Sequence, residues 1–223
     1  DEIVAARIGE TLAPLATLEA LHRDAATPAP VRGLAFHLLE GLGTAEIGLS
    51  ADLVGSLDDA GRKRLARLGV RFGVHAIYIQ ALLRDRPLAL RRLLWQLHHP
   101  NQPLPLPGAT SLVADPRVGE VDYRAIGYRL MRGHALRVDI AERLAQALRQ
   151  GTRDGRAFAP GPDLGGLTGL KRHELDSVIQ AFGYRRLPGD GGQAHFRRIN
   201  RRGAEQRRAA APQRPQGHQA FAV

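Results

Sequence analysis

The sequence contains no cysteine among its 223 residues, few aromatic residues and only two lysines. The absence of cysteine excludes disulfides, thiolate zinc ligands and cysteine nucleophiles together. No apolar run approaches the roughly 18 residues that cross a bilayer, and the first ten residues lack the apolar stretch of a signal peptide. We therefore expect neither membrane attachment nor secretion, and we expect the protein to act in the cytoplasm.

Motifs of common enzymes are missing as well. A phosphate-binding loop needs a glycine-rich turn that ends in lysine, but Lys63 and Lys171 stand in RKR and LKR contexts. The nine histidines form no HExxH motif, and no serine has the surroundings of a nucleophile elbow. We therefore expect no catalytic residue, no metal site and no cofactor within this chain.

The formal net charge of +10 is unevenly distributed. Residues 1–50 contain 3 basic and 7 acidic residues, a net charge of −4, whereas residues 51–223 contain 29 and 15, a net charge of +14. A basic body favours a polyanionic partner, most often RNA or DNA. Arginine supplies 30 of the 32 basic residues, so the composition of a GC-rich genome is an alternative explanation.

Helical periodicity dominates the first hundred residues. Apolar residues recur at helical spacing over 2–22, where Pro14 is expected to kink the helix or split it in two. Further helices are predicted near 31–42 and 51–54. Residues 56–99 are predicted to form a helix, a short extended segment and a second helix with an apolar stripe. The stripe consists of Leu90, Leu93, Leu94 and Leu97, with Arg91 and Arg92 outside it.

The pattern changes after residue 99. Five prolines fall within 100–119, which predicts a semi-rigid linker. The sequence downstream predicts a strand pair, then a helix opened by a capping box of Asp139 and Glu142. A short helix, a turn, a third helix and a hairpin follow. Helix, short helix, turn, helix and hairpin is the element order of a winged helix.

These patterns predict a mainly α protein with small β-hairpins. We expect a helical domain over 1–99, a proline-rich linker over 100–120 and a winged-helix-like domain over 121–199. Residues 200–223 are poor in large apolar residues and rich in arginine, alanine, glutamine and proline. This composition is typical of a disordered basic tail.

Basic residues gather on the predicted winged unit. In such a unit the third helix fits a major groove and the wing lays cations along phosphates. Other winged helices only pack against protein, and that interpretation stays open. Tyr184 is a candidate to stack on a base, whereas Trp95 and Tyr128 fit a core better. The predicted nucleic-acid-binding residues are Lys171, Arg172, Arg185, Arg186, Arg197 and Arg198.

Four stretches resemble a known family. They are GLAFHLLEGLG (Gly33–Gly43), LARLGVRFGVHAIYIQALLRDRPLALRRLLW (Leu65–Trp95), AIGYRLMRGHALRVDIAERLAQALR (Ala125–Arg149) and LTGLKRHELDSVIQAFGYR (Leu167–Arg185). In this order they resemble the region after the motor domains of large bacterial superfamily 2 helicases, which are related to the mitochondrial RNA-degradation helicase. The resemblance implies upstream motor domains that bind ATP and magnesium. The chain begins with Asp1, so we expect a fragment or a processed product.

Three functional hypotheses follow. The leading one is a non-catalytic accessory region of an ATP-dependent helicase that holds or guides the unwound RNA or DNA strand. The second is a free-standing winged-helix DNA-binding regulator, which dimerisation and sequence preference would distinguish. The third is a protein–protein adaptor whose acidic first fifty residues dock a partner, and a nucleic-acid titration separates it from the other two.

Overall fold

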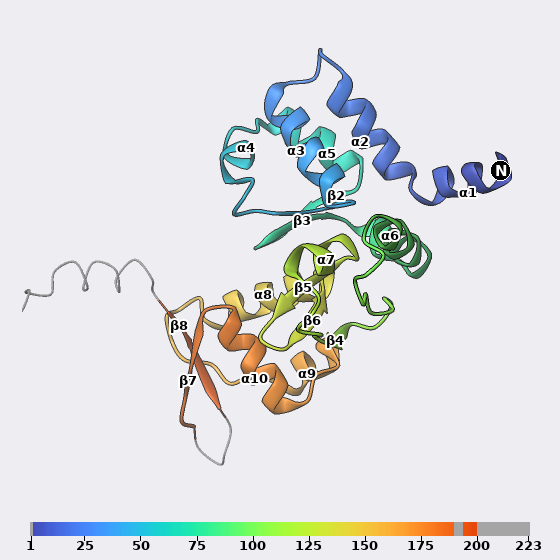
Figure 1. Cartoon of the computed structure of the whole chain (residues 1–223). Coiled ribbons are helices and arrows are strands. Elements are labelled where there is room, and N and C mark those ends of the chain that lie inside the picture. Colours follow the sequence, from blue (N-terminus) through green and yellow to red (C-terminus); the bar gives the residue numbers. More distant parts are fainter. Residues whose placement is uncertain (1, 190–193, 200–223) are drawn as a thin grey trace, which may run out of the picture.

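The computed structural model describes residues 2–189 and 194–199 (Figure 1). This part of the chain is a mixed α/β structure, about 52% helix, with small antiparallel sheets. Helices predominate and hairpins are present, as the sequence predicts. The predicted tail, 200–223, lies outside the described residues.

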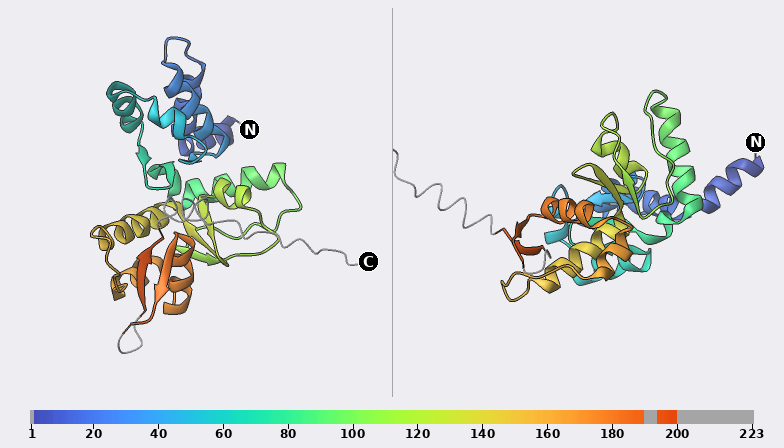
Figure 2. Two further views of the ribbon diagram at one scale, coloured as in Figure 1. Left: turned by 90° about the vertical axis from the view of Figure 1, so that its left-hand side faces the viewer. Right: turned by 90° about the horizontal axis from the view of Figure 1, so that it is seen from below.

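The first unit surrounds a three-stranded sheet. Its helices are α1 (Glu2–Thr11), α2 (Ala13–Arg23), α3 (Ala29–Glu40), α4 (Ala51–Gly55), α5 (Asp59–Arg67) and α6 (Asp85–His98), with a 3-10 helix η1 (Gln80–Leu83). Its strands are β1 (Thr44–Glu46), β2 (Val70–Phe72) and β3 (Ala76–Ile79). The break between α1 and α2 at Leu12 places Pro14 in the first turn of α2, so the predicted split is confirmed. Figures 1 and 2 show α1 projecting away from the rest of the unit.

The sheet makes the first unit mixed rather than mainly helical, and the extended segment predicted within 56–99 supplies two of its strands, β2 and β3. Its strand order is β1-β3-β2, and all pairs are antiparallel. Every residue of the central strand β3 is buried, and Ile77 and Ile79 are at most 1% exposed. A strand that is covered on both faces has a continuous run of apolar residues in its sequence. The first unit and helix α8 of the second unit both pack against β3.

The second unit contains two further small sheets. Its elements are β4 (Ser111–Val113), α7 (Glu120–Ala125), β5 (Tyr128–Met131), β6 (His134–Arg137), α8 (Val138–Gly151), α9 (Pro162–Thr168), α10 (Arg172–Ala181), β7 (Tyr184–Leu187) and β8 (His195–Arg198). One sheet has the order β4-β6-β5, and β7 pairs with β8. Residues 138–198 therefore show the predicted succession of helix, short helix, helix and hairpin.

The predicted linker, 100–120, makes specific contacts. It includes β4, which pairs with β6. The side chain of Arg92 donates hydrogen bonds to the carbonyl oxygens of Leu104 and Pro105, at 3.0 and 3.1 Å. Leu104 is itself buried in a cluster with Tyr123 of α7. The proline-rich segment thus packs along α6, and the division into domains at this segment stays a prediction.

Arg91 joins the two units from within. Its side chain is fully buried, although the sequence placed it outside the apolar stripe of α6. The prediction of that stripe was wrong at two of its four positions, because Leu93 and Leu97 are 53% and 69% exposed. The guanidinium donates to the carbonyl oxygens of Ala125, Arg124, Gly41 and Leu82 and to Oγ1 of Thr44, at 3.0 to 3.4 Å. These acceptors belong to both units, so one side chain holds their backbones together.

Two hydrophobic clusters form the main cores. The first is built on Leu18, Leu34, Leu38, Leu65 and Ile77. The second is built on Leu144, Leu148, Val178, Ile179 and Phe196. The second core anchors α10 and the β7–β8 hairpin against α8, and this packing fixes where their charged side chains lie.

Candidate nucleic-acid interface

The β7–β8 hairpin presents arginines on both of its faces. Arg185 pairs with Arg197 across the ribbon, and both side chains are exposed. Arg186 pairs with Phe196, whose ring is fully buried against the core. Because residues opposite each other in an antiparallel pair share a face, Arg185 and Arg186 point to opposite sides. The two neighbouring arginines therefore cannot contact one phosphate strand in the same way.

Arg186 is paired with a residue of helix α10. Its Nε lies 3.2 Å from Oδ2 of Asp176 on α10. The side chain is 52% exposed, so the ion pair contributes little to stability. It nevertheless neutralises one of the charges that the sequence assigned to nucleic acid.

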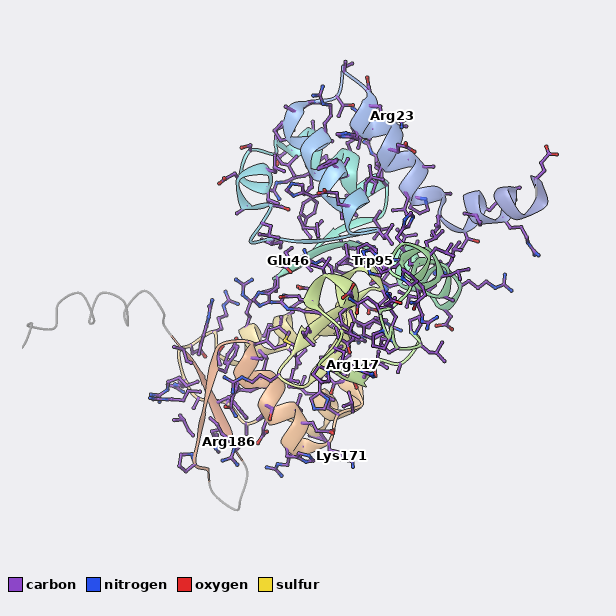
Figure 3. All side chains as sticks on the ribbon, viewed as in Figure 1. Arg23, Glu46, Trp95, Arg117, Lys171 and Arg186 are labelled. Atoms are coloured by element: carbon purple, nitrogen blue, oxygen red, sulfur yellow. The ribbon has the colours of Figure 1, made fainter. Side chains whose placement is uncertain are left out.

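Lys171 and Arg172 lie at the beginning of α10. Glu174 caps this end by accepting a hydrogen bond from the backbone N–H of Lys171 at 2.7 Å. The hairpin starts at the other end of the helix, after a turn at Gly183 with a φ of +86°. Figure 3 shows Lys171 beside the start of α10 and Arg186 on the hairpin. The six predicted residues thus lie in separate places rather than in one cluster.

A basic groove opens at the base of the hairpin. Its volume is about 920 Å³, and it is formed by β5, the end of α8, the end of α10 and β8. No aspartate or glutamate lines it within the described residues. The lining residues are His75, Arg129, Thr152, Arg153, Gly155, Ala181, Phe182, Gly183, Arg197, Arg198 and Ile199. Four arginines without a lining carboxylate create a positive potential that favours phosphate.

Two rings form the apolar part of this groove. The ring centroids of His75 and Phe182 lie 5.4 Å apart at an interplanar angle of 42°. The guanidinium of Arg129 lies 5.8 Å from the centroid of Phe182, a cation–π contact. His75 comes from the β2–β3 loop of the first unit, whereas the other groups belong to the second. The groove is therefore a composite of both units.

A carboxylate buried between the units holds the β2–β3 loop in place. Glu142 of α8 accepts hydrogen bonds from the backbone N–H groups of Val74, His75 and Ala76, the last at 2.8 Å. Burial raises the pKa of Glu142, and the three backbone hydrogen bonds oppose this rise. Consecutive N–H groups that converge on an anion form a nest, here filled by the protein's own carboxylate.

The predicted capping box of Asp139 and Glu142 is not formed. Helix α8 begins at Val138, so Asp139 lies inside its first turn rather than at its cap. Asp139 instead accepts from the guanidinium of Arg137 at 2.7 Å and from Gln80 at 3.2 Å. The two acidic residues do not form the predicted reciprocal cap, because Glu142 is engaged with the β2–β3 loop and Asp139 with Arg137 and Gln80.

The Glu142 nest leads to a prediction at Gly73. A methyl group on Gly73 would collide with the Glu142 carboxylate and come within 2.8 Å of the Ala76 carbonyl oxygen. We expect Gly73→Ala to lower the free energy of unfolding by about 2–4 kcal/mol, because the displaced carboxylate leaves buried donors unpaired. Gly9→Ala is the matched control, since nothing lies within 4 Å of that position in α1. Urea unfolding measures both, and equal stability of the two variants would contradict the role of the nest.

His75 leads to a pH prediction. Burial lowers the pKa of His75 to about 4, and Arg129, Arg149 and Arg198 act in the same direction. The folded state therefore binds fewer protons than the unfolded state between pH 6.5 and 4, so stability falls as the pH falls through this window. We expect a contribution of roughly 1–2 kcal/mol, reduced by solvent screening because the ring is partly exposed. His75→Gln should flatten the dependence of the unfolding free energy on pH, and an unchanged slope would contradict the assignment.

The aromatic candidates from the sequence lie elsewhere. Tyr184 and Tyr128 are 4% and 1% exposed, so neither can stack on a base. The hydroxyl of Tyr128 donates to the carbonyl oxygen of Ala109 at 2.7 Å. Trp95 donates to Asp122 at 2.8 Å and does not line the groove. Phe182, at the end of α10, is the ring that reaches the groove.

Comparisons with known proteins do not assign the chain to a family. Neither family models, nor curated protein sequences, nor solved structures gave a match. Among the described residues no helix is long and apolar enough to cross a bilayer. Nor do three or more metal-ligating side chains gather anywhere in 2–189 and 194–199.

Proposed function

We propose that the chain is a non-catalytic region that grips single-stranded RNA or DNA in the basic groove. The observation that carries this proposal is the groove itself, where four arginines and an accessible aromatic ring meet without a lining carboxylate. Single-strand-binding proteins combine a positive channel for phosphates with rings on which bases stack. Arg129, Arg153 and Arg198 take the phosphates, Arg197 adds positive charge from the other face of β8, and Phe182 offers the ring.

The fold adds a second argument. We interpret α8, α9, α10 and the β7–β8 hairpin as a winged-helix unit, with α10 as its third helix. In this unit α10 exposes only its first turn, because from Glu174 onward its side chains are partly or fully buried. A helix covered in this way offers little surface for a major groove. This disfavours the free-standing DNA-binding regulator and favours binding at the base of the wing.

We propose that the chain is an accessory region of a larger helicase. Its sequence resembles the region behind the motor domains of superfamily 2 helicases, which bind ATP and magnesium. We propose that in the cytoplasm it holds the unwound strand next to such a motor. The groove combines His75 of the first unit with arginines of the second, so a bound strand would also bridge the two units.

Fluorescence anisotropy with labelled oligonucleotides tests the proposal. We expect single strands to bind at least about tenfold more tightly than duplexes of the same length, since only unpaired bases reach Phe182. The logarithm of affinity should fall linearly with the logarithm of salt concentration, with a slope of about −0.7 for each phosphate contacted. Equal binding of duplex and single strand would contradict the single-strand site, and no binding at about 50 mM salt would exclude a nucleic-acid function.

A further inference from the structure

A second cavity lies on the junction between the units, away from the basic groove. It has a volume of about 510 Å³ and is enclosed by α3, β1, α6 and α7. We call it the junction cavity. Figure 3 shows Glu46 and Trp95 on the two sides of the region where the first unit meets the second. Its lining residues are His37, Glu40, Gly41, Thr44, Ala45, Glu46, Leu49, Ser50, Trp95, Val121, Arg124 and Ala125.

Trp95 forms a fixed apolar wall of this cavity. Its Nε1 donates to Oδ1 of Asp122 at 2.8 Å, and its ring stacks on His99 with centroids 4.3 Å apart. Leu49 and Val121 lie on the same lining and are 69% and 58% exposed. Exposed apolar side chains beside a cavity are typical of a binding surface. The walls thus favour a ligand with apolar parts.

The charges of the cavity select against anions. Glu40 and Glu46 both line it, and the single lining guanidinium, Arg124, already pairs with Glu46 at 3.3 Å. The ring of His37 hydrogen-bonds to Oγ of Ser50 at 2.8 Å. The excess of carboxylate repels phosphate and attracts a cation. This is the opposite preference to that of the basic groove.

One donor of Arg124, a residue that lines the cavity, has no acceptor. Among the described residues, Nε of Arg124 is buried and has no hydrogen-bond partner. An unpaired buried donor is destabilising, and a ligand carbonyl oxygen would satisfy it once the Arg124 side chain turns toward the cavity. A protonated amine or a metal ion cannot do this, because neither accepts a hydrogen bond. A peptide offers both a carbonyl oxygen and a cationic side chain.

We propose that the junction cavity binds a segment of a partner protein that presents an arginine flanked by apolar residues. The guanidinium lies against Trp95 and between the carboxylates of Glu40 and Glu46, where cation–π and ionic attraction add. A backbone carbonyl of the partner accepts from Arg124, and its apolar neighbours cover Leu49 and Val121. This inference goes beyond the nucleic-acid function and does not depend on it.

The emission of Trp95, the only tryptophan of the chain, reports binding directly. We would titrate the full chain with a capped leucine–arginine–leucine peptide and with the same peptide containing citrulline, a neutral isostere of arginine. We expect a saturable change in emission, with the citrulline peptide at least about tenfold weaker because it lacks the charge. Equal binding of both peptides, or no saturable change, would overturn the proposal.

Three variants make the test specific. Glu40→Gln and Glu46→Gln should each weaken the arginine peptide about tenfold, and Glu10→Gln, an exposed residue of α1, should leave it unchanged. Glu40 is exposed and has no role in the core, so its variant separates binding from folding. Wild-type affinity in both cavity variants would contradict the site.

Two competing occupants are tested in the same assay. Changing the five arginines of 200–223 to glutamine should leave peptide affinity unchanged. Tighter peptide binding by that variant would show that the chain's own tail fills the cavity, and the partner proposal would fall. Competition between the peptide and a single-stranded oligonucleotide would likewise overturn it, because the cavity would then serve nucleic acid.

Discussion

The double substitution Arg129→Ala and Arg198→Ala is expected to weaken single-strand binding about a hundredfold at about 0.1 M salt. Both arginines line the basic groove, where no lining carboxylate competes with phosphate among the described residues. A hydrogen bond to a charged group contributes roughly 1.5–3 kcal/mol, so each lost phosphate contact should cost about tenfold or more. The slope of the logarithm of affinity against the logarithm of salt concentration should also become less negative by about 1.4, which is about 0.7 for each phosphate no longer contacted.

A matched control separates the groove from net charge. Arg67→Ala with Arg86→Ala removes the same two charges from exposed positions on α5 and α6, which do not line the groove. We expect this control to change affinity less than about threefold, through long-range attraction alone. An equal loss in the groove variant and the control would mean that the basic surface binds diffusely and that the groove is no site.

The substitution Arg91→Ala is expected to lower the free energy of unfolding by about 3–5 kcal/mol, the largest stability effect predicted for this chain. Burial lowers the pKa of the Arg91 guanidinium to about 9, so the group remains charged at neutral pH. Its five acceptors would lose their donor, and the interior would gain a cavity. Urea unfolding followed by Trp95 emission measures the loss.

Two further variants define what Arg91 does. Arg91→Lys should recover only part of the stability, because one ammonium cannot reach acceptors spread around a planar guanidinium. Arg86→Ala, on the same helix but exposed, should change stability by less than about 0.5 kcal/mol. A loss below about 1 kcal/mol for Arg91→Ala would show that water replaces the guanidinium easily, and the two units would not depend on it.

Local chemistry made much of the fold predictable. The break at Pro14, the succession of helices in the first unit and the order of α8, α9, α10 and the hairpin follow from proline, glycine and apolar spacing. The first-unit sheet was harder to predict, because β1 has only three residues and forms by pairing with β3, 30 to 34 positions further on. Such pairing depends on tertiary packing more than on local propensity.

The candidate site was predictable only in part. Arg197 and Arg198 were expected on the wing and do line the groove, whereas Lys171 and Arg185 lie outside its lining. Arg129, Arg153 and His75 were missed, because the chain brings them together only through the packing of α8 against β3. The nest around Glu142 depends on backbone N–H groups 66 to 68 residues away, which leave no signal in the sequence.

Comparing two full-length variants tests the central claim most directly. One carries Arg129→Ala and Arg198→Ala, and the other carries glutamine in place of the five tail arginines, Arg201, Arg202, Arg207, Arg208 and Arg214. Anisotropy titration with one labelled single strand at fixed salt should show about a hundredfold loss for the groove variant and less than about tenfold for the tail variant. The reverse result, with binding abolished by the tail changes and intact in the groove variant, would contradict the groove as the nucleic-acid site.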